Sequence, residues 1–367
     1  MKRILLFRHL LIFSLLCACS NSDDNTDVEP PIENTDPGSN IIEMYFPPIG
    51  SDIWETQNLE AINWNSTALE PLLNFLENSD TGTFMILYKG RIVTENYFNG
   101  SDANSNLPWF SAGKTLSAFM VGIAQEEGFL ELTDSSSDYL GEGWTSLSAE
   151  QESQINVFHH LTMTSGLDYN VNGFCTDAEC LNYLNPAGSF WYYHNAPYTL
   201  TQSIVSGAIE GSFDLYFKNK LRDPIGMQGA WVSSGFNRFY FSNARSMARF
   251  GLLCLNEGIW EDTAIMNDSS FFQEMVNTSQ NLNEAYGYLW WLNGKNSFRV
   301  PDSIQQFSGK LVPNAPDDLI AGLGANDQKL YVVPSRDLVI VRQGGDAGSA
   351  LLGPSSYDNE LWSYISD

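Results

Sequence analysis

A serine and a lysine three positions apart are the residues of this chain best suited to chemistry. Ser111 and Lys114 begin an apolar run that continues from Thr115 to Glu127, and no other Ser-x-x-Lys occurs. Three residues span almost one turn of an α-helix, so the hydroxyl and the amine would lie on one face within contact distance. A neutral lysine can accept the serine proton, which would make the pair a nucleophile and its base.

The lysine can act as a base only if its pKa is lowered, because a free lysine has a pKa near 10.4 and is charged at pH 7. Bringing it to about 7 to 8 takes roughly 3 to 4 kcal/mol, and burial against the apolar run works in that direction. The positive helix end also favours negative charge on Ser111, whose backbone N–H is placed to bind an oxyanion. The alternative is an N-capping serine beside a surface lysine.

A second candidate element is Tyr193-His194-Asn195. A phenol beside a lysine can pass the serine proton to a leaving group, and an amide two residues on can bind a substrate carbonyl. His194, between them, is a candidate for lining the site. A Ser-His-Asp triad is the rival chemistry, but the sequence has no Gly-x-Ser-x-Gly elbow. It also has no metal-ligand spacing and no Gly-rich nucleotide loop, so no metal and no cofactor are expected.

Composition indicates a folded, acidic protein. The 367 residues are 43% hydrophobic and 13% aromatic, enough for a large core. The net charge of -26 becomes -29 if Lys2, Arg3 and Arg8 are removed with a leader. Such a chain repels nucleic acid and favours neutral or cationic partners, although acidity for solubility alone is the simpler reading.

The N-terminus has the layout of an export signal. Basic residues precede the apolar run Leu10–Leu16, which is too short to span a bilayer. Leu16-Cys17-Ala18-Cys19 then resembles a bacterial lipobox; ordinary cleavage is the alternative. We expect residues 1–19 to be a signal peptide with Cys19 as the lipidated first mature residue, 20–40 a flexible acidic tether, and 41–367 the hydrolase domain. The protein would be exported and anchored at the outer membrane or cell surface.

The coarse pattern is sheet, long helical insertion, sheet. Thr83–Tyr88 with Ile92–Phe98, and Lys329–Val333 with Leu338–Arg342, read as hairpins. Helices are expected at the following segments: 115–127, ending at Gly128, then 200–210, 213–221, 244–255 and 358–365. We predict an α/β (α+β) fold, with an antiparallel sheet built from both chain ends, flanking helices and a large inserted helical lobe.

The remaining cysteines leave one question open. Cys175 and Cys180 flank four residues and could form a local disulfide in an oxidising compartment, or less simply a metal site. Cys254, in an apolar stretch, is expected to be a buried core residue.

These motifs together resemble the serine β-lactamase-like hydrolases, which include class C β-lactamases, D-alanyl-D-alanine peptidases and related esterases and amide hydrolases. The resemblance covers about Thr83 to Ile365. The segments that carry it are Phe110-Ser111-Ala112-Gly113-Lys114, His160-Leu161-Thr162-Met163-Thr164-Ser165-Gly166-Leu167, Tyr193-His194-Asn195, Asp223-Pro224-Ile225-Gly226-Met227, Ser246–Leu253 and Tyr286–Trp291. It implies that Ser111 is the nucleophile, that Lys114 and Tyr193 are general bases, and that Asn195 positions substrate.

The chain departs from the family at the third motif, normally Lys-Thr-Gly or His-x-Gly. The corresponding stretch, Gly322–Gln328, contains no Lys or His. The resemblance implies that the Ala325 N–H is the second oxyanion donor beside Ser111, with Gly324 as the other choice and Asn326 as a neighbour in substrate binding. Without that cation a substrate carboxylate is poorly held.

The sequence therefore favours an exported serine hydrolase that cleaves an ester or amide through an acyl-serine. The alternatives are a β-lactamase or D-alanyl-D-alanine peptidase, and a surface binding protein with weak catalysis on the same fold.

Overall fold

The two hairpins predicted from the sequence form, and they pair with each other. The computed structural model describes residues 42–171, 173–348 and 353–366, so the predicted signal peptide, Cys19 and the tether at 20–40 lie outside it. Strand β1 lies beside β13 in an antiparallel ladder, with Met85 opposite Val341. The sheet is thus assembled from segments near both ends of the chain, which confirms the predicted fold class.

The main sheet runs in the order β2-β1-β13-β12-β11-β8, and every neighbouring pair in it is antiparallel. Its strands are β1 (Thr81–Tyr88), β2 (Arg91–Tyr97), β8 (Trp291–Leu292), β11 (Ile320–Gly324), β12 (Gln328–Val333) and β13 (Leu338–Gly344). Strands β11 and β12 are buried along their whole length. A strand buried on both faces requires cover on both faces, and helices supply it.

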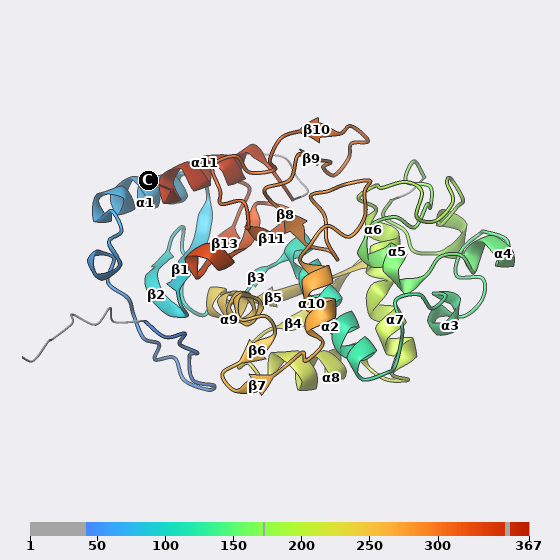
Figure 1. The fold of residues 1–367 in the computed structure, drawn as a ribbon, viewed down its shortest axis with the longest axis horizontal. Coiled ribbons are helices and arrows are strands. Elements are labelled where there is room, and N and C mark those ends of the chain that lie inside the picture. Colours follow the sequence, from blue (N-terminus) through green and yellow to red (C-terminus); the bar gives the residue numbers. More distant parts are fainter. Residues whose placement is uncertain (1–41, 172, 349–352, 367) are drawn as a thin grey trace, which may run out of the picture. The chain divides into compact units, whose positions relative to one another are not determined.

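Helices α1 (Leu69–Asn78) and α11 (Ser356–Ile365) lie along one side of the sheet and α9 (Ala244–Leu255) along the other (Figure 1). Phe75 of α1 stacks on Tyr357 of α11 with ring centroids 5.3 Å apart. A Cβ at Gly251 of α9 would come within 2.5 Å of Val339, so only glycine allows α9 to approach β13 this closely. The predicted helix at 244–255 is observed with the same bounds.

Helix α2 (Lys114–Glu126) runs through the middle of the molecule, with every residue from Lys114 to Ala124 buried. The predicted stop is confirmed, since Gly128 follows the helix with φ of 74°. The other helices of the inserted lobe are α3 (Ser137–Leu140), α4 (Ala149–Glu152), α5 (Val157–Leu161), α6 (Asn195–Thr199), α7 (Thr201–Ala208) and α8 (Phe213–Phe217). The helix predicted at 213–221 is α-helical only to Phe217 and continues as a π-helical turn, Lys218–Arg222.

The remaining elements are short. They are β3 (Leu107–Pro108), β4 (Ala230–Ser234), β5 (Asn237–Ser242), β6 (Ile259–Trp260), β7 (Thr263–Ala264), α10 (Ser269–Met275), β9 (Ser297–Phe298), β10 (Phe307–Ser308) and the 3-10 turns η1 (Glu60–Ile62), η2 (Ser66–Ala68), η3 (Phe110–Gly113), η4 (Ala178–Cys180) and η6 (Pro334–Arg336). Within the described ranges, no helix has the length and apolarity needed to cross a membrane.

Strand β11 was not predicted from the sequence, and its residues explain why. Its small residues, including Gly322 and Gly324, carry no strand signal. They are required by packing: a Cβ at Gly322 would lie 3.2 Å from Thr115 Cγ2, and one at Gly324 would lie 2.4 Å from Trp109 O. The strand therefore presses its backbone against the segment that carries Ser111.

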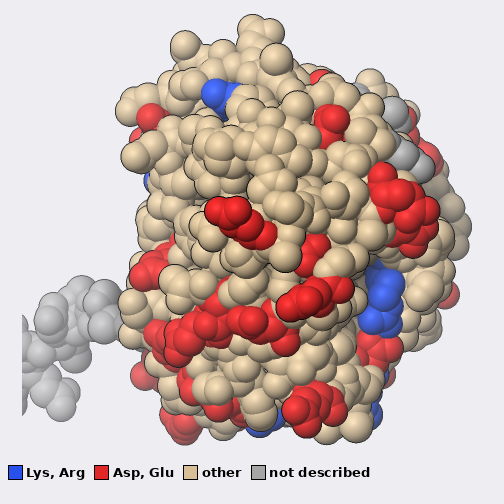
Figure 2. Space-filling view, turned by 90° about the vertical axis from the view of Figure 1, so that its right-hand side faces the viewer, with Lys and Arg blue, Asp and Glu red and all other residues tan. Residues whose placement is uncertain are grey.

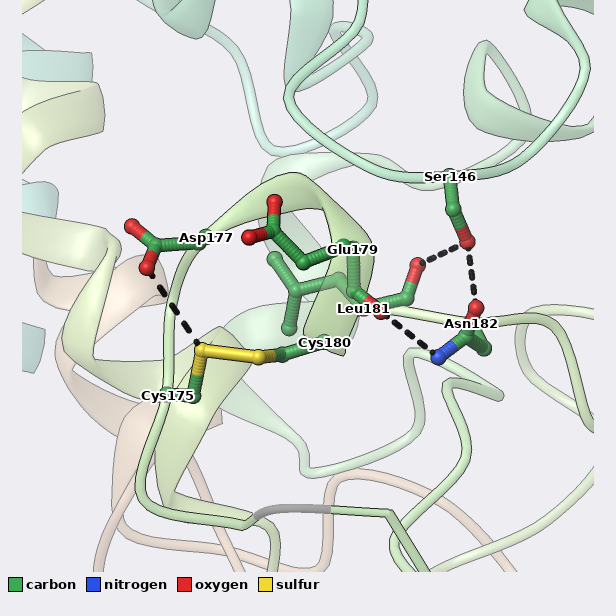
Figure 3. Close-up of a disulfide and its surroundings, with 7 residues drawn as sticks. All are labelled: Ser146, Cys175, Asp177, Glu179, Cys180, Leu181 and Asn182. Carbon is green, nitrogen blue, oxygen red and sulfur yellow. Dashed lines mark hydrogen bonds between the residues drawn. A yellow bond between two sulfur atoms is a disulfide. The ribbon is translucent and has the colours of Figure 1, made fainter.

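Cys175 and Cys180 form a disulfide in the loop between α5 and α6 (Figure 3). Next to it, the Ser146 hydroxyl donates to Leu181 O at 3.1 Å and to Asn182 Oδ1 at 2.7 Å, which fastens this loop to the preceding part of the lobe. Cys254 is buried in the core, as predicted.

Candidate active site

Ser111 lies in a constrained turn at the entrance to α2. The turn is η3, and Phe110 in it adopts φ of 45°, a left-handed conformation that an aromatic residue rarely takes. Trp109 holds the turn in place, since its Nε1–H donates to Ser242 Oγ at 2.8 Å and its N–H donates to Tyr240 O at 2.8 Å. The surrounding structure thus maintains an unfavourable backbone conformation next to Ser111, a feature found more often at functional sites.

Lys114 lies against Ser111 in a dry environment. Its Nζ donates to Ser111 Oγ at 2.9 Å and to Asn195 Oδ1 at 2.9 Å, and the residue is only 1% exposed. Among the described residues no carboxylate forms an ion pair with it, and no charged group contributes to its pKa shift. Burial therefore lowers the pKa of Lys114 well below its usual range.

Two tyrosine rings oppose this lowering of the Lys114 pKa. Lys114 Nζ lies 3.9 Å from the centroid of the Tyr198 ring and 5.0 Å from that of Tyr193. Each ring face favours the ammonium when water is excluded. Burial acts against the charged form and is the larger effect, because the pKa of Lys114 still lies well below its usual range. The neutral amine is therefore favoured at the site.

Tyr193 comes from the extended segment before α6. It is 3% exposed and stacks on Trp291, with ring centroids 5.7 Å apart. Its hydroxyl is buried and makes no hydrogen bond of normal geometry within the described part of the chain. Burial raises the pKa of this phenol, the neighbouring Ser111 hydroxyl lowers it, and the charge of Asp302 raises it further. Tyr193 is therefore a protonated phenol at neutral pH, with its hydroxyl beside that of Ser111.

The histidines do not assemble a triad with Ser111. His160 donates from Nδ1 to Pro197 O at 2.6 Å and contacts Ser136 Oγ through Nε2, which ties α5 to α6. His159 accepts at Nδ1 from the Asn156 N–H as part of a capping box. His194 is 5% exposed, and burial lowers its pKa to about 4 while Asp168 opposes that shift. Its Nδ1 has no partner among the described residues.

The third motif reaches the site from β11. Gly324 abuts the backbone of the Ser111 turn, since a Cβ there would lie 3.0 Å from Ala112 N. Ala325 and Asn326 follow it in the turn between β11 and β12 and are half-buried. The structure therefore brings Ser111, Lys114, Tyr193, Asn195 and the Gly324–Asn326 segment to one region from separate parts of the sequence.

Three features of the site were not predicted from the sequence. Asn195, expected to contact substrate, also accepts a hydrogen bond from Lys114. The rings of Tyr198 and Trp291 form the walls around Lys114 and Tyr193. Arg342 contacts the turn after Ala325. The sequence did contain a sign of this role, because Arg342 is a cation inside the apolar strand Leu338–Gly344, and a charge in a buried strand must have partners.

Other candidate sites do not compete with this one. Within residues 42–171, 173–348 and 353–366, no group of three His, Cys, Asp or Glu side chains could hold a metal. A cavity of about 400 Å³ lies elsewhere, between α1, η2, the end of α11 and the β1–β2 hairpin, and Ser111 does not line it. Its lining includes Trp64 and Tyr88.

Comparison with known proteins places the chain in a family. A family model described as Beta-lactamase matches residues 77–342. The protein named as penicillin-binding protein PbpX of Bacillus subtilis (strain 168) is 27% identical over 187 residues, covering 47% of this chain and 45% of the relative. The chain thus matches about half the length of that relative.

Two solved structures share the fold. A Bacillus anthracis protein named as a 6-aminohexanoate-dimer hydrolase has a TM-score of 0.65 and 18% identity, over 88% of each chain. A family VIII carboxylesterase has a TM-score of 0.60 and 14% identity, over 82% of this chain and 97% of the other. Because the family model matches residues 77–342, most of the chain, this protein belongs to the Beta-lactamase family.

Proposed function

We propose that this protein is a serine hydrolase that cleaves an ester or amide through an acyl-serine intermediate. The observation that carries the proposal is the 2.9 Å contact between Lys114 Nζ and Ser111 Oγ, with the lysine buried and without a carboxylate partner in the described structure. If Lys114 were charged at neutral pH, its ammonium could only donate a hydrogen bond to Ser111 Oγ. A neutral lysine amine can accept the serine proton.

In the proposed reaction, Ser111 Oγ attacks the carbonyl carbon while its proton passes to Lys114. The oxyanion is bound by the N–H groups of Ser111 and Ala325. Tyr193, a protonated phenol beside both groups, gives its proton to the departing alcohol or amine and regains one from Lys114. Water then attacks the acyl-serine, releasing a carboxylic acid and restoring the Ser111 hydroxyl.

We propose a neutral or cationic substrate. The third motif, Gly322–Gln328, offers no cation to a substrate carboxylate. The carboxylates of Asp302 and Asp168 act on Tyr193 and His194 respectively, so the local field is negative. Figure 2, which looks onto the side of the inserted lobe, shows acidic side chains spread over the face and few basic ones. The structures named as a family VIII carboxylesterase and a 6-aminohexanoate-dimer hydrolase, which share the fold, suit this class.

The test is activity-based labelling with a matched control. Wild type should hydrolyse p-nitrophenyl acetate and react with a fluorophosphonate probe, and Ser111→Ala should abolish both. Ser117→Ala removes another buried hydroxyl of α2, bonded only weakly to Gln202 at 3.4 Å, and should keep both. Full-rate labelling of Ser111→Ala would remove Ser111 from the mechanism. A folded wild type that neither labels nor turns over any ester would favour the surface-binding role instead.

A second candidate function is action on cell-wall substrates, as a D-alanyl-D-alanine peptidase or β-lactamase. It has one specific observation in its favour besides the penicillin-binding relative. Arg299 lies over the Phe190 ring at 5.9 Å, and its Nε is buried without a partner in the described structure. Although its Nη1 donates to Ile304 O at 3.1 Å, the unpartnered Nε lies near the segment that carries Tyr193 and suits a substrate carboxylate. Release of D-alanine from muropeptides, or turnover of a chromogenic cephalosporin, lost in Arg299→Gln, would establish this function.

We also propose export and lipid anchoring through Cys19, on the sequence pattern alone. In a producing bacterium, the wild type should sediment with membranes and Cys19→Ser should not carry the lipid. Unchanged membrane association of a Cys19→Ser protein would contradict the anchor.

A further inference from the structure

The turn that follows Ala325 has a backbone that its own residues do not favour. Asn326 and Asp327 are consecutive and both adopt left-handed conformations, with φ of 55° and 53°. Asparagine and aspartate tolerate this region singly better than most residues, but two in succession need support from outside the turn. Asp327 is also 1% exposed, so it cannot obtain that support from water.

Arg342, on the neighbouring strand β13, supplies part of this support. Its Nη1 donates to the carbonyls of Asn326 at 3.0 Å and Asp327 at 2.9 Å. The guanidinium also binds Gly345 O, Ser79 O and Thr81 Oγ1, and it is fully buried. Arg342 thus binds the turn through backbone carbonyls, and these hydrogen bonds orient both carbonyls toward the same side of the turn.

Gln328 and Asp327 hold the turn in the same position. Gln328 Nε2 donates to Asn326 O at 2.8 Å and to Gly344 O at 2.7 Å, while its Oε1 accepts from the Gly344 N–H at 3.1 Å. The Asp327 carboxylate accepts from Ser355 Oγ at 2.8 Å and meets Lys329 Nζ at 3.1 Å. The two left-handed residues of the turn are therefore held by side chains on both sides of it, of which Gln328, Lys329 and Arg342 are buried.

We propose that Arg342, with Gln328, is a positioning residue that holds the Ala325 N–H where it can bind the oxyanion. Gly324 already touches the Ser111 turn, so the placement of Ala325 depends on how the next two residues fold back. The segment Gly322–Gln328 has no cation of its own, and Arg342 on the adjacent strand supplies one. This guanidinium binds carbonyls of the protein and not the substrate. This inference rests on the proposed function.

The first variant is Arg342→Lys, which keeps the charge but not the planar set of donors. Loss of one oxyanion donor lowers kcat by about 10²- to 10³-fold, so a displaced donor should lower kcat by about 10- to 100-fold, with KM changed less than threefold. Affinity for phenylboronic acid, whose tetrahedral adduct with Ser111 places an oxygen at the oxyanion site, should fall by the same factor as kcat.

The matched control is Arg249→Lys. Arg249 is another buried arginine that binds backbone carbonyls, those of Pro47, Pro48 and Ile225, on a helix away from the turn. The Arg249→Lys variant should be less stable than wild type but have the same kcat. Equal losses of kcat in both variants would reduce Arg342 to a general structural role, and a folded Arg342→Lys with wild-type kcat and boronate affinity would overturn the proposal.

Gln328→Ala gives a second route if Arg342→Lys does not fold. It removes the amide from Asn326 O and should lower kcat and boronate affinity together by about 10-fold; unchanged values of both would also overturn the proposal. Failure of the proposed function is recognised separately, because wild type would then show neither ester turnover nor labelling of Ser111.

Discussion

Within the described part of the chain, Lys114 and Lys329 are both buried, and their surroundings differ. Lys329, on β12, meets Asp358 at 3.0 Å and Asp327 at 3.1 Å. Lys114, at the start of α2, meets a hydroxyl and an amide, with no carboxylate among the described residues. A buried cation with two counter-ions is stable as a charge, whereas one with only neutral partners gives up its proton more easily.

The same difference extends to the two regions that contain these lysines. Between Thr115 and Phe217, the sequence has no Lys or Arg at all. In that region the basic groups are the buried His160 and His194 and the half-buried His159, and burial lowers the pKa of each to about 4. On the sheet side, buried cations such as Arg342 are surrounded by carbonyls. Basic groups in the sheet region thus act as charged links, and those of the inserted lobe are held neutral.

The largest effect should come from Lys114→Met. Removing a general base lowers kcat/KM by about 10²- to 10⁴-fold, while removing an uncompensated buried amine should leave the free energy of unfolding unchanged or raise it. Ester hydrolysis and urea unfolding measure the two quantities. In wild type, the rate should rise with pH as Lys114 loses its proton; a rate independent of pH from 5 to 9, with chemistry rate-limiting, would contradict a titrating base.

Lys329→Met should behave in the opposite way. It removes the ammonium that meets the buried carboxylates of Asp327 and Asp358, which costs about 3 to 5 kcal/mol of stability. Urea unfolding of the two methionine variants side by side tests the comparison directly. Equal stability losses in both would show that Lys114 is also a structural charge and is not neutral in the folded protein.

A smaller effect is expected from pH. In the unfolded chain a histidine has a pKa near 6.5, and in the folded protein that of His160 is about 4, lowered by burial. Between these values the unfolded chain binds more protons, so stability is lost as pH falls. Each such histidine should cost about 2 kcal/mol between pH 7 and pH 5. The difference in unfolding free energy between the two pH values should shrink by that amount in His160→Gln; an unchanged difference would show that His160 does not titrate in this way.

Much of the fold could be read from local patterns. Both hairpins, α2, α9 and α11 follow from strand composition, helical apolar spacing and glycine stops, each of which acts within a few residues. Strands β4, β5 and β11 were not predicted. The prediction missed β11 because its glycines are required by contact with residues about two hundred positions earlier in the chain. Local sequence patterns contain no information about such a contact.

The candidate site divides in a similar way. The spacing of Ser111 and Lys114 on one helical turn was evident from the sequence, and their contact at 2.9 Å agrees with it. The partners Asn195 and Tyr198 were not evident as such, because they approach Lys114 only after α6 packs beside α2. Arg342 was overlooked because its role depends on strand pairing and not on its neighbours in sequence.

By itself, the sequence determined which reactive groups are present and that an apolar helix would carry two of them, because side-chain chemistry and helical spacing are local properties. Only the tertiary structure decided that Lys114 is buried against neutral partners while Lys329 is buried against two carboxylates. That outcome depends on which carboxylates, carbonyls and rings the folded chain brings to each amine, and desolvation and Coulomb energy are set by those distances.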